Sequence, residues 1–102
     1  MYLHAKQRLS ALTKAAGAAP LKGGLLGLEK ESLRVAPDGS IAQTPHPAAL
    51  GSALLHPWIT TDYSEALLEF ITPPMASTTA ALDYLRDLQH FVYLQLEGEL
   101  LW

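Results

Sequence analysis

The 102-residue sequence predicts an α+β fold in which an antiparallel sheet has helices packed on one face. Two segments, residues 26–35 and 66–72, alternate their side chains with the two-residue period of a strand. A turn signal of Pro, Asp, Gly and Ser at residues 37–40 follows the first segment, so residues 41–44 are expected to return antiparallel. An amphipathic helix that begins near Ser77 is expected to lie across this sheet.

The other elements follow from helix formers and helix breakers. A leading helix is predicted over residues 2–16, stopped by Gly17 and Pro20, so that residues 1–20 form the first unit. Residues 23–73 then hold the strands, the hairpin and a short helix that runs from Pro47 to Leu54. The last helix is assigned to residues 76–98. Its core-facing positions recur at helical spacing at Leu82, Leu85, Leu88, Phe91 or Val92, and Gln95 or Leu96, whereas Asp83, Arg86, Asp87 and His90 form its polar face.

Composition excludes several classes of function. The formal net charge is −3, and only 7 Lys and Arg residues are present, so we expect no binding to nucleic acid or to an anionic membrane. The absence of cysteine excludes a disulfide framework, a thiolate nucleophile and a thiolate zinc site. No apolar run approaches the roughly 18 to 20 residues that span a bilayer, and no leader is recognised, so a cytoplasmic protein is expected.

Four acidic residues, Glu29, Glu31, Asp62 and Glu69, lie in stretches whose apolar neighbours are expected to be buried. In the first strand Leu33 and Val35 share a face with the two glutamates, so this face is expected to be apolar at one end and acidic at the other. A buried carboxylate needs a cation or hydrogen bonds to compensate for the water that it loses. Residues two apart on a strand are about 7 Å apart, a spacing at which two carboxylates can bracket divalent metal ions.

The segment around Glu69 is ambiguous from its pattern alone. As a strand it places Glu69 beside Leu67 and Ile71, without a solvent-facing side. As a helix it would be capped by Asp62 or Ser64, with Glu65 and Glu69 on one exposed side. A solvated or salt-bridged role is the alternative to metal binding for all four acids.

Other candidates are weaker. Arg34 lies on the strand face opposite the glutamates and could contact a phosphate or a substrate carboxylate, although a structural ion pair is the more ordinary use. Thr60 and Thr61, beside Asp62, could line the same pocket or merely favour a strand. His46 and His56 each precede a proline in loops, where packing or exposure is the default over metal ligation.

Linked motifs in residues 23–96 carry a resemblance to a known family. They are GLEKESLRV at residues 27–35, DG at 38–39, HP at 46–47, LGSAL at 50–54, WITTD at 58–62 and EALLEFITP at 65–73. In identity, order and spacing they resemble the amino-terminal part of bacterial glutamate–cysteine ligase, also called gamma-glutamylcysteine synthetase. A single Glu-x-Glu would mean little, but the combination is specific.

The resemblance implies an ATP-dependent ligase that joins the gamma-carboxyl of L-glutamate to the amine of L-cysteine through gamma-glutamyl phosphate, the first step of glutathione synthesis. It implies that the sheet is part of an open half-barrel similar to that of glutamine synthetase, and that Glu69 lies on a strand. By their place in the motifs, Glu29, Glu31, Asp62 and Glu69 resemble the family's magnesium-binding acids. Mg²⁺ is a hard ion that prefers oxygen ligands and commonly links carboxylates to nucleotide phosphates.

The family is several times longer than this chain, and the sequence ends on the apolar residues Leu100, Leu101 and Trp102. We therefore expect a fragment that is inactive alone and that self-associates through its uncovered apolar surface. Two other hypotheses remain open at this point. One is a ligase of the same superfamily with a different acceptor amine, and the other is a non-catalytic interaction or regulatory module that keeps the ligase fold.

Overall fold

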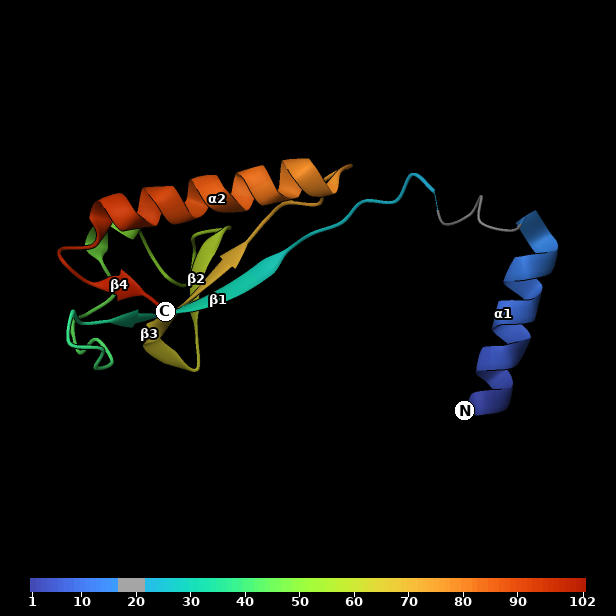
Figure 1. Cartoon of the computed structure of the whole chain (residues 1–102), viewed down its shortest axis with the longest axis horizontal. Coiled ribbons are helices and arrows are strands. Elements are labelled where there is room, and N and C mark those ends of the chain that lie inside the picture. Colours follow the sequence, from blue (N-terminus) through green and yellow to red (C-terminus); the bar gives the residue numbers. More distant parts are fainter. Residues whose placement is uncertain (17–21) are drawn as a thin grey trace.

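A four-stranded antiparallel sheet with one helix across it forms the body of the molecule (Figure 1). The computed structural model describes residues 1–16 and 22–102. The strand order is β2-β3-β1-β4, and the helix α2 lies along one face of the sheet. The elements of this body are β1 (Glu29–Val35), β2 (Ile59–Asp62), β3 (Ser64–Ile71), α2 (Thr78–Gln95) and β4 (Leu100–Leu101). The predicted α+β class is confirmed.

The register of the sheet separates two faces. Alternate residues of β3, namely Ala66, Leu68 and Phe70, are buried beneath α2, and the residues between them lie on the other face. β1 pairs antiparallel with β3 so that Ser32 faces Leu68 and Glu31 faces Glu69. The segment around Glu69 is therefore a strand, and the alternative of a capped helix is wrong.

The core lies between the sheet and α2. Leu50, Ile59, Leu68, Phe70 and Val92 are at most 1% exposed, and Leu85, Leu88, Leu96 and Leu101 pack against them half-buried. α2 begins after Ser77, whose Oγ accepts a hydrogen bond from the Ala80 N–H, as expected of an N-cap. The helix is shorter than the predicted 76–98 because the backbone turns to an extended conformation at Leu96.

The apolar stripe of α2 is narrower than its sequence suggests. Ala81 and Val92 are fully buried, whereas Leu82 stays 53% exposed and Phe91 40% exposed. A sheet of four short strands offers too little surface to cover the whole apolar side of an 18-residue helix.

The predicted return strand and short helix are both reduced. Asp38 Oδ1 accepts hydrogen bonds from the N–H and Oγ of Ser40, and Gly39 takes φ +85°, so the turn is confirmed. Residues 41–44 nevertheless form only a single bridge, between Ile41 and Val35. β3 already pairs with β1 as far as Leu33, so little of that edge of β1 remains available to residues 41–44.

The helix expected from Pro47 to Leu54 is a single 3₁₀ turn, Ala48–Leu50. Gly51 ends it with φ +79°, a conformation that cannot continue a helix. Leu50 is only 1% exposed and anchors this turn in the core.

The leading helix α1 (Tyr2–Ala16) matches its predicted range, but it does not cover the sheet. Figure 1 shows α1 apart from the body, and Leu3 and Leu9 are each about two-thirds exposed. Of the two helices, only α2 packs on the sheet face. The predicted end of the leading unit at residues 17–20 lies outside the described residues. Across residues 1–16 and 22–102, no helix has the length and apolar character needed to cross a membrane.

Candidate metal-binding face of the sheet

Glu31 and Glu69 lie directly opposite each other on neighbouring strands, and Thr60 lies opposite Glu69 on its other side. Glu29 comes two residues before Glu31 and faces Ile71. Asp62 ends β2, beyond a register shift between Thr61 and Asp62, and pairs with Ser64. Strand parity thus gathers Glu29, Glu31 and Glu69 on the face that α2 does not cover, and Asp62 lies near enough for its charge to act on Glu69. We call Glu29, Glu31, Asp62 and Glu69 the acidic face.

The acids themselves are less buried than predicted. Glu29 and Glu31 are exposed, and Asp62 and Glu69 are half-buried. Along the same side of β1, Leu33 is half-buried and Val35 is 7% exposed, so the expected change from acidic to apolar is present. The acids remain open to solvent because no described element covers this side of the sheet as α2 covers the other (Figure 1).

The carboxylates perturb one another. Partial burial raises the pKa of Glu69 above its usual value, and the negative charges of Glu29, Asp62 and Glu31 raise it further. A carboxyl group surrounded by other carboxylates is stabilised by a proton or by a cation. The electrostatics of the acidic face therefore favour the binding of positive charge.

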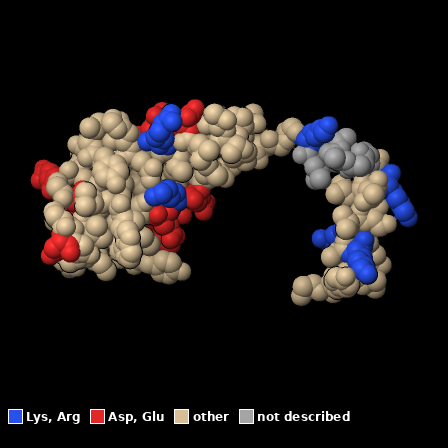
Figure 2. Space-filling model, viewed as in Figure 1, with Lys and Arg blue, Asp and Glu red and all other residues tan. Residues whose placement is uncertain are grey.

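No cation of the protein supplies that charge among the described residues. The two ion pairs found there join Arg34 to Glu99 and Arg86 to Asp83. Lys30 follows Glu29 in sequence, but its Nζ donates a hydrogen bond to Ser32 Oγ and lies 5.9 Å from the ring centroid of Phe70. In Figure 2 basic side chains line α1 and others lie on the body beside acidic ones, whereas all the visible acidic side chains lie on the body.

The acids share a face without converging on one point. Within residues 1–16 and 22–102, no three Asp, Glu or His side chains are close enough to hold one metal ion as a cage. This arrangement still suits Mg²⁺, which is usually held by one or two carboxylates together with waters and substrate phosphates. The donor chemistry, hard oxygen ligands with excess negative charge, fits the same ion.

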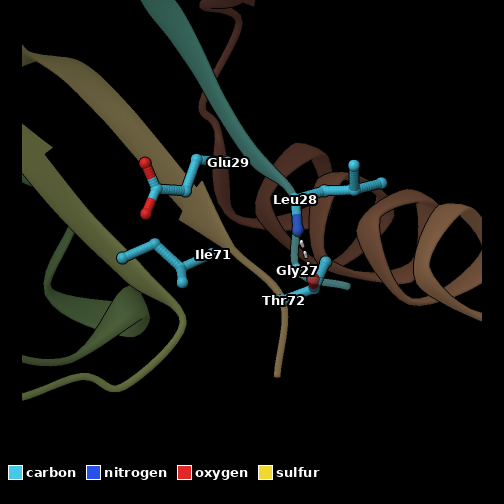
Figure 3. A pocket seen from close by; sticks show the side chains of 5 residues that line it. All are labelled: Gly27, Leu28, Glu29, Ile71 and Thr72. Carbon is cyan, nitrogen blue, oxygen red and sulfur yellow. Dashed lines mark hydrogen bonds between the residues drawn. The ribbon is translucent and has the colours of Figure 1, made fainter. Parts of the chain in front are cut away.

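A pocket of about 250 Å³ adjoins the acidic face where β1 begins. Figure 3 shows that Glu29 and Ile71 line one side of it and that Leu28 points away from them. The Leu28 N–H donates a 2.9 Å hydrogen bond to Thr72 Oγ1, which joins the two chain segments. Gly27 lies close to Thr72, since a Cβ on this glycine would be 3.7 Å from the Thr72 carbonyl oxygen. A small ligand group bound in this pocket would be in reach of Glu29.

The hairpin between β2 and β3 contains the one residue other than glycine with a positive φ among those described. Tyr63 has φ +53° and is 98% exposed, and its N–H donates a 3.0 Å hydrogen bond to Asp62 Oδ1. This bond fixes the Asp62 carboxylate beside the turn. Sequence pattern does not single out Tyr63, since Asp-Tyr-Ser carries no glycine signal for a tight turn.

The weaker candidates lie elsewhere or are already engaged. Thr60 shares the acidic side, but its hydroxyl donates a 2.5 Å hydrogen bond to the Ala53 carbonyl. Thr61 faces Leu68 on the opposite side of the sheet. Arg34 is fully buried on that side and pairs with Glu99, which favours the structural interpretation of this arginine over contact with a phosphate at the acidic face.

The two loop histidines differ in their surroundings. His56 Nδ1 accepts hydrogen bonds from the N–H groups of Trp58 and Ile59, and thereby organises the start of β2. Both ring nitrogens of His46 are buried without a hydrogen-bond partner. Burial lowers the pKa of His46, and the positive charge of Arg34 lowers it further against an opposing effect of Glu65. Neither ring faces the acidic side chains closely enough to form a metal-binding group with them.

Comparison with known proteins decides the family. The model of the family described as glutamate-cysteine ligase matches residues 9–102. The chain belongs to the glutamate–cysteine ligase family. It is similar to the glutamate–cysteine ligase of Alcanivorax borkumensis, with 57% identity over 99 residues, which are 97% of this chain and 19% of that protein. The ligase of Pseudomonas entomophila is 60% identical over 82 residues, covering 80% of this chain and 16% of the relative.

Solved structures of similar proteins agree with the fold. A glutamate–cysteine ligase of Francisella tularensis in complex with AMP superimposes with a TM-score of 0.76 at 38% identity, over 78% of this chain and 16% of that one. A bifunctional glutathione synthetase of Pasteurella multocida superimposes with a TM-score of 0.73 at 44% identity, over 76% of this chain and 11% of that one. The chain spans less than a fifth of the length of the relatives it matches.

Proposed function

We propose that this chain supplies the magnesium-binding acids of an ATP-dependent ligase that joins L-glutamate to L-cysteine. The single observation that carries the proposal is the pairing of Glu31 with Glu69 across two strands, with no protein cation to compensate them among the described residues. Family membership supports the reaction, since the relatives are named glutamate–cysteine ligases. The AMP in the Francisella tularensis complex supports an adenine nucleotide as co-substrate.

Each acid has a distinct proposed position around the ligand. Glu31 and Glu69 act as a central pair, each able to offer an oxygen to a shared or neighbouring ion. Glu29 acts at the pocket end of β1, and Asp62 acts at the hairpin end of β2, where the Tyr63 N–H orients its carboxylate. Bound Mg²⁺ supplies charge neutralisation for the phosphate oxygens during phosphoryl transfer from ATP to the glutamate carboxylate.

The chain's own contribution is positioning and electrostatics. The proposed reaction through gamma-glutamyl phosphate requires no nucleophile from the side chains of the acidic face. The half-buried Glu69 is held on a strand whose other side is fixed in the core by Leu68 and Phe70. Such a rigid support suits metal-binding side chains, which must keep their geometry while two anionic substrates approach each other. Thr60 faces Glu69, and its hydroxyl is engaged by the Ala53 carbonyl.

The test uses a hybrid ligase, in which residues 1–102 replace the matching segment of the Alcanivorax borkumensis enzyme. The hybrid ligase is expected to hydrolyse ATP only when both glutamate and cysteine are present, and the 102-residue chain alone is expected to give no turnover. Glu31→Gln and Glu69→Gln should each raise the half-saturating Mg²⁺ concentration by roughly 10-fold or more. Asp87→Asn, on the exposed side of α2, is the matched control and should leave it unchanged.

The acceptor amine is tested in the same enzyme. Replacement of cysteine by other amino acids in the assay separates a cysteine-specific ligase from one that uses another amine. ATP hydrolysis that needs no glutamate, or a Mg²⁺ requirement that ignores both glutamine variants, would contradict the proposal.

A further inference from the structure

Arg34 has the richest set of side-chain hydrogen bonds on β1, and all of them lie on the side of the sheet opposite the acidic face. Its Nη1 donates to Glu99 Oε2 at 2.7 Å and to Thr44 Oγ1 at 2.8 Å. Its Nη2 donates to the carbonyl oxygens of Thr44 at 2.9 Å and Glu65 at 3.2 Å. Arg34 is fully buried, and the Glu99 side chain is 14% exposed.

These bonds tie together four segments that are distant in sequence. The guanidinium connects β1 with the loop at Thr44, with the beginning of β3 at Glu65, and with the residue that precedes β4, Glu99. Thr44 Oγ1 also donates to Glu99 Oε1, so that the loop and the residue before β4 are joined directly. The Glu65 carboxylate accepts a 2.8 Å hydrogen bond from the His46 N–H. Glu65 is thus held at both its carbonyl and its carboxylate.

The observed register of β1 on β3 needs stabilising interactions of this kind. It places Glu31 directly opposite Glu69, although like charges at opposing positions destabilise a sheet. The apolar pattern of β3 excludes a slip by one residue, which would expose Leu68 and Phe70, but a slip by two residues would keep the same face buried. Core packing alone therefore does not exclude a register in which Glu31 no longer opposes Glu69.

Arg34 is placed where it can set this register. The paired part of the β1–β3 ladder ends at Leu33 and Leu67. The guanidinium of the next residue on β1 reaches the carbonyl of Glu65, two residues before Leu67 on β3. Every residue of β3 has a main-chain carbonyl, so the bond from Arg34 alone would also form with a slipped strand. The bond from the His46 N–H to the Glu65 carboxylate is specific to one register, because a slipped β3 would place a different side chain there.

We propose that Arg34, acting through Glu65 and Glu99, is a positioning residue that fixes the β1–β3 register and thereby holds Glu31 opposite Glu69 for metal binding. The inference rests on the proposed function for its metal readout, and on the geometry of β1 for its structural readout. Arg34 does not touch substrate or metal in this account. Its effect passes through the strand that it shares with Glu31.

The test introduces Arg34→Met and Arg34→Lys into the hybrid ligase, with Arg86→Met as the matched control. Arg86 also forms an ion pair, with Asp83, but its side chain is 74% exposed on α2 and is remote from β1. Two quantities are measured: the half-saturating Mg²⁺ concentration together with the rate at saturating Mg²⁺, and the register of Glu31 against Glu69 in crystal structures of the variants.

Arg34→Met is expected to raise the half-saturating Mg²⁺ concentration roughly 10- to 100-fold, as changes behind metal ligands typically do. The rate at saturating Mg²⁺ should fall by less than about threefold, because excess metal compensates for misplaced ligands. Arg34→Lys keeps the charge but cannot bond to Glu99, Thr44 and Glu65 together, so its effect should be intermediate. Arg86→Met should match the unmodified hybrid ligase.

An unchanged Mg²⁺ requirement in a folded Arg34→Met enzyme, or a crystal structure in which Glu31 still opposes Glu69 as before, overturns the inference. If Arg34→Met does not fold, Arg34→Lys and Glu99→Gln carry the test with the same two measurements. Failure of the proposed function is distinguishable: in that case Glu31→Gln and Glu69→Gln leave the Mg²⁺ requirement unchanged, while the crystal structures still report whether Arg34 sets the register.

Discussion

Glu31 on β1 and Glu69 on β3 face each other directly, on the side of the sheet that α2 does not cover. The partner strand β2 places Thr60 beside Glu69 and contributes no positive charge to the row. Two adjacent carboxylates without a counter-ion are unfavourable for folding and favourable for cation binding. The predicted behaviour of the protein follows from this conflict.

Removing one charge of this pair should stabilise the protein in the absence of metal. Glu69→Gln is expected to raise the free energy of unfolding at neutral pH by about 0.5 kcal/mol, because it ends the repulsion with Glu29, Asp62 and Glu31. The folded-state pKa of Glu69 is raised, so the free energy of unfolding falls as the pH rises from about 4.5 to that pKa. In Glu69→Gln, which has no carboxyl group to titrate at this position, this fall should be absent. Urea unfolding across this pH range measures both effects. A Glu69→Gln protein less stable than the original at neutral pH would contradict the account.

The buried ion pair of Arg34 and Glu99 should respond to acid in the opposite direction. Burial acts to raise the pKa of Glu99, but hydrogen bonds from Thr44 and Arg34 and the Arg34 charge outweigh it, so the pKa is lowered. The pair therefore stabilises the fold above the unfolded-state pKa of about 4.5, and this contribution is lost as pH falls through the folded-state pKa. Glu99→Gln should cost about 3 kcal/mol at neutral pH, since it leaves Arg34 buried without its counter-charge.

Urea unfolding at neutral and acidic pH checks this prediction. The difference between Glu99→Gln and the original protein should shrink as the pH falls. Glu97→Gln, two residues earlier and exposed, is the control, and it should differ little from the original protein. A constant difference across the acidic range would show that the charge of Glu99 contributes nothing to stability.

His46 should make stability depend on pH in the range near neutrality. Its pKa is lowered from 6.5 by burial and by Arg34, so the unfolded chain takes up a proton before the folded chain does. Stability is therefore expected to fall as the pH decreases below about 6.5 toward the folded-state pKa. His46→Asn should reduce this slope, whereas His90→Asn, at an exposed position on α2, should keep it. NMR titration of the His46 ring gives its pKa directly, and a value above 6.5 would refute the prediction.

The N-cap of α2 gives a test of the fold that is independent of the acids. Ser77→Ala removes the acceptor for the Ala80 N–H and is expected to cost about 1 kcal/mol. Thr79→Ala, within the first turn of the helix, should be nearly neutral because alanine has the higher helix propensity. Thermal unfolding followed by circular dichroism compares the two variants. Equal stability of Ser77→Ala and the original protein would show that the cap is dispensable.

Sequence periodicity predicted the parts of this structure that depend on local pattern. The range of α1, the strand face that carries Glu29 and Glu31, and the cap at Ser77 all follow from spacing and residue type. The strand at Glu69 could not be separated from a helix by its pattern, because a short apolar run fits both periods. There, family resemblance gave the correct answer, and β3 confirms it.

The remaining features depend on contacts between distant residues. Arg34 and Glu99 are separated by 65 positions, so no local signal joins them. The two-residue strand β4 is too short for a periodic pattern. The pairing of β3 with β1 as far as Leu33 explains why the expected hairpin partner at Ile41 pairs only once. The short helix predicted after Pro47 ended early because Gly51 adopts a positive φ, which a helix-forming neighbourhood does not reveal.

The most direct test of the acidic face is the position of Mn²⁺, used in place of Mg²⁺, in crystals of the hybrid ligase, located by its anomalous scattering. We expect an ion bound to carboxylate oxygens of Glu31 or Glu69, with its anomalous peak lost in Glu69→Gln crystals. Ions bound only to residues outside the acidic face, with Glu31 and Glu69 left free, would contradict this expectation.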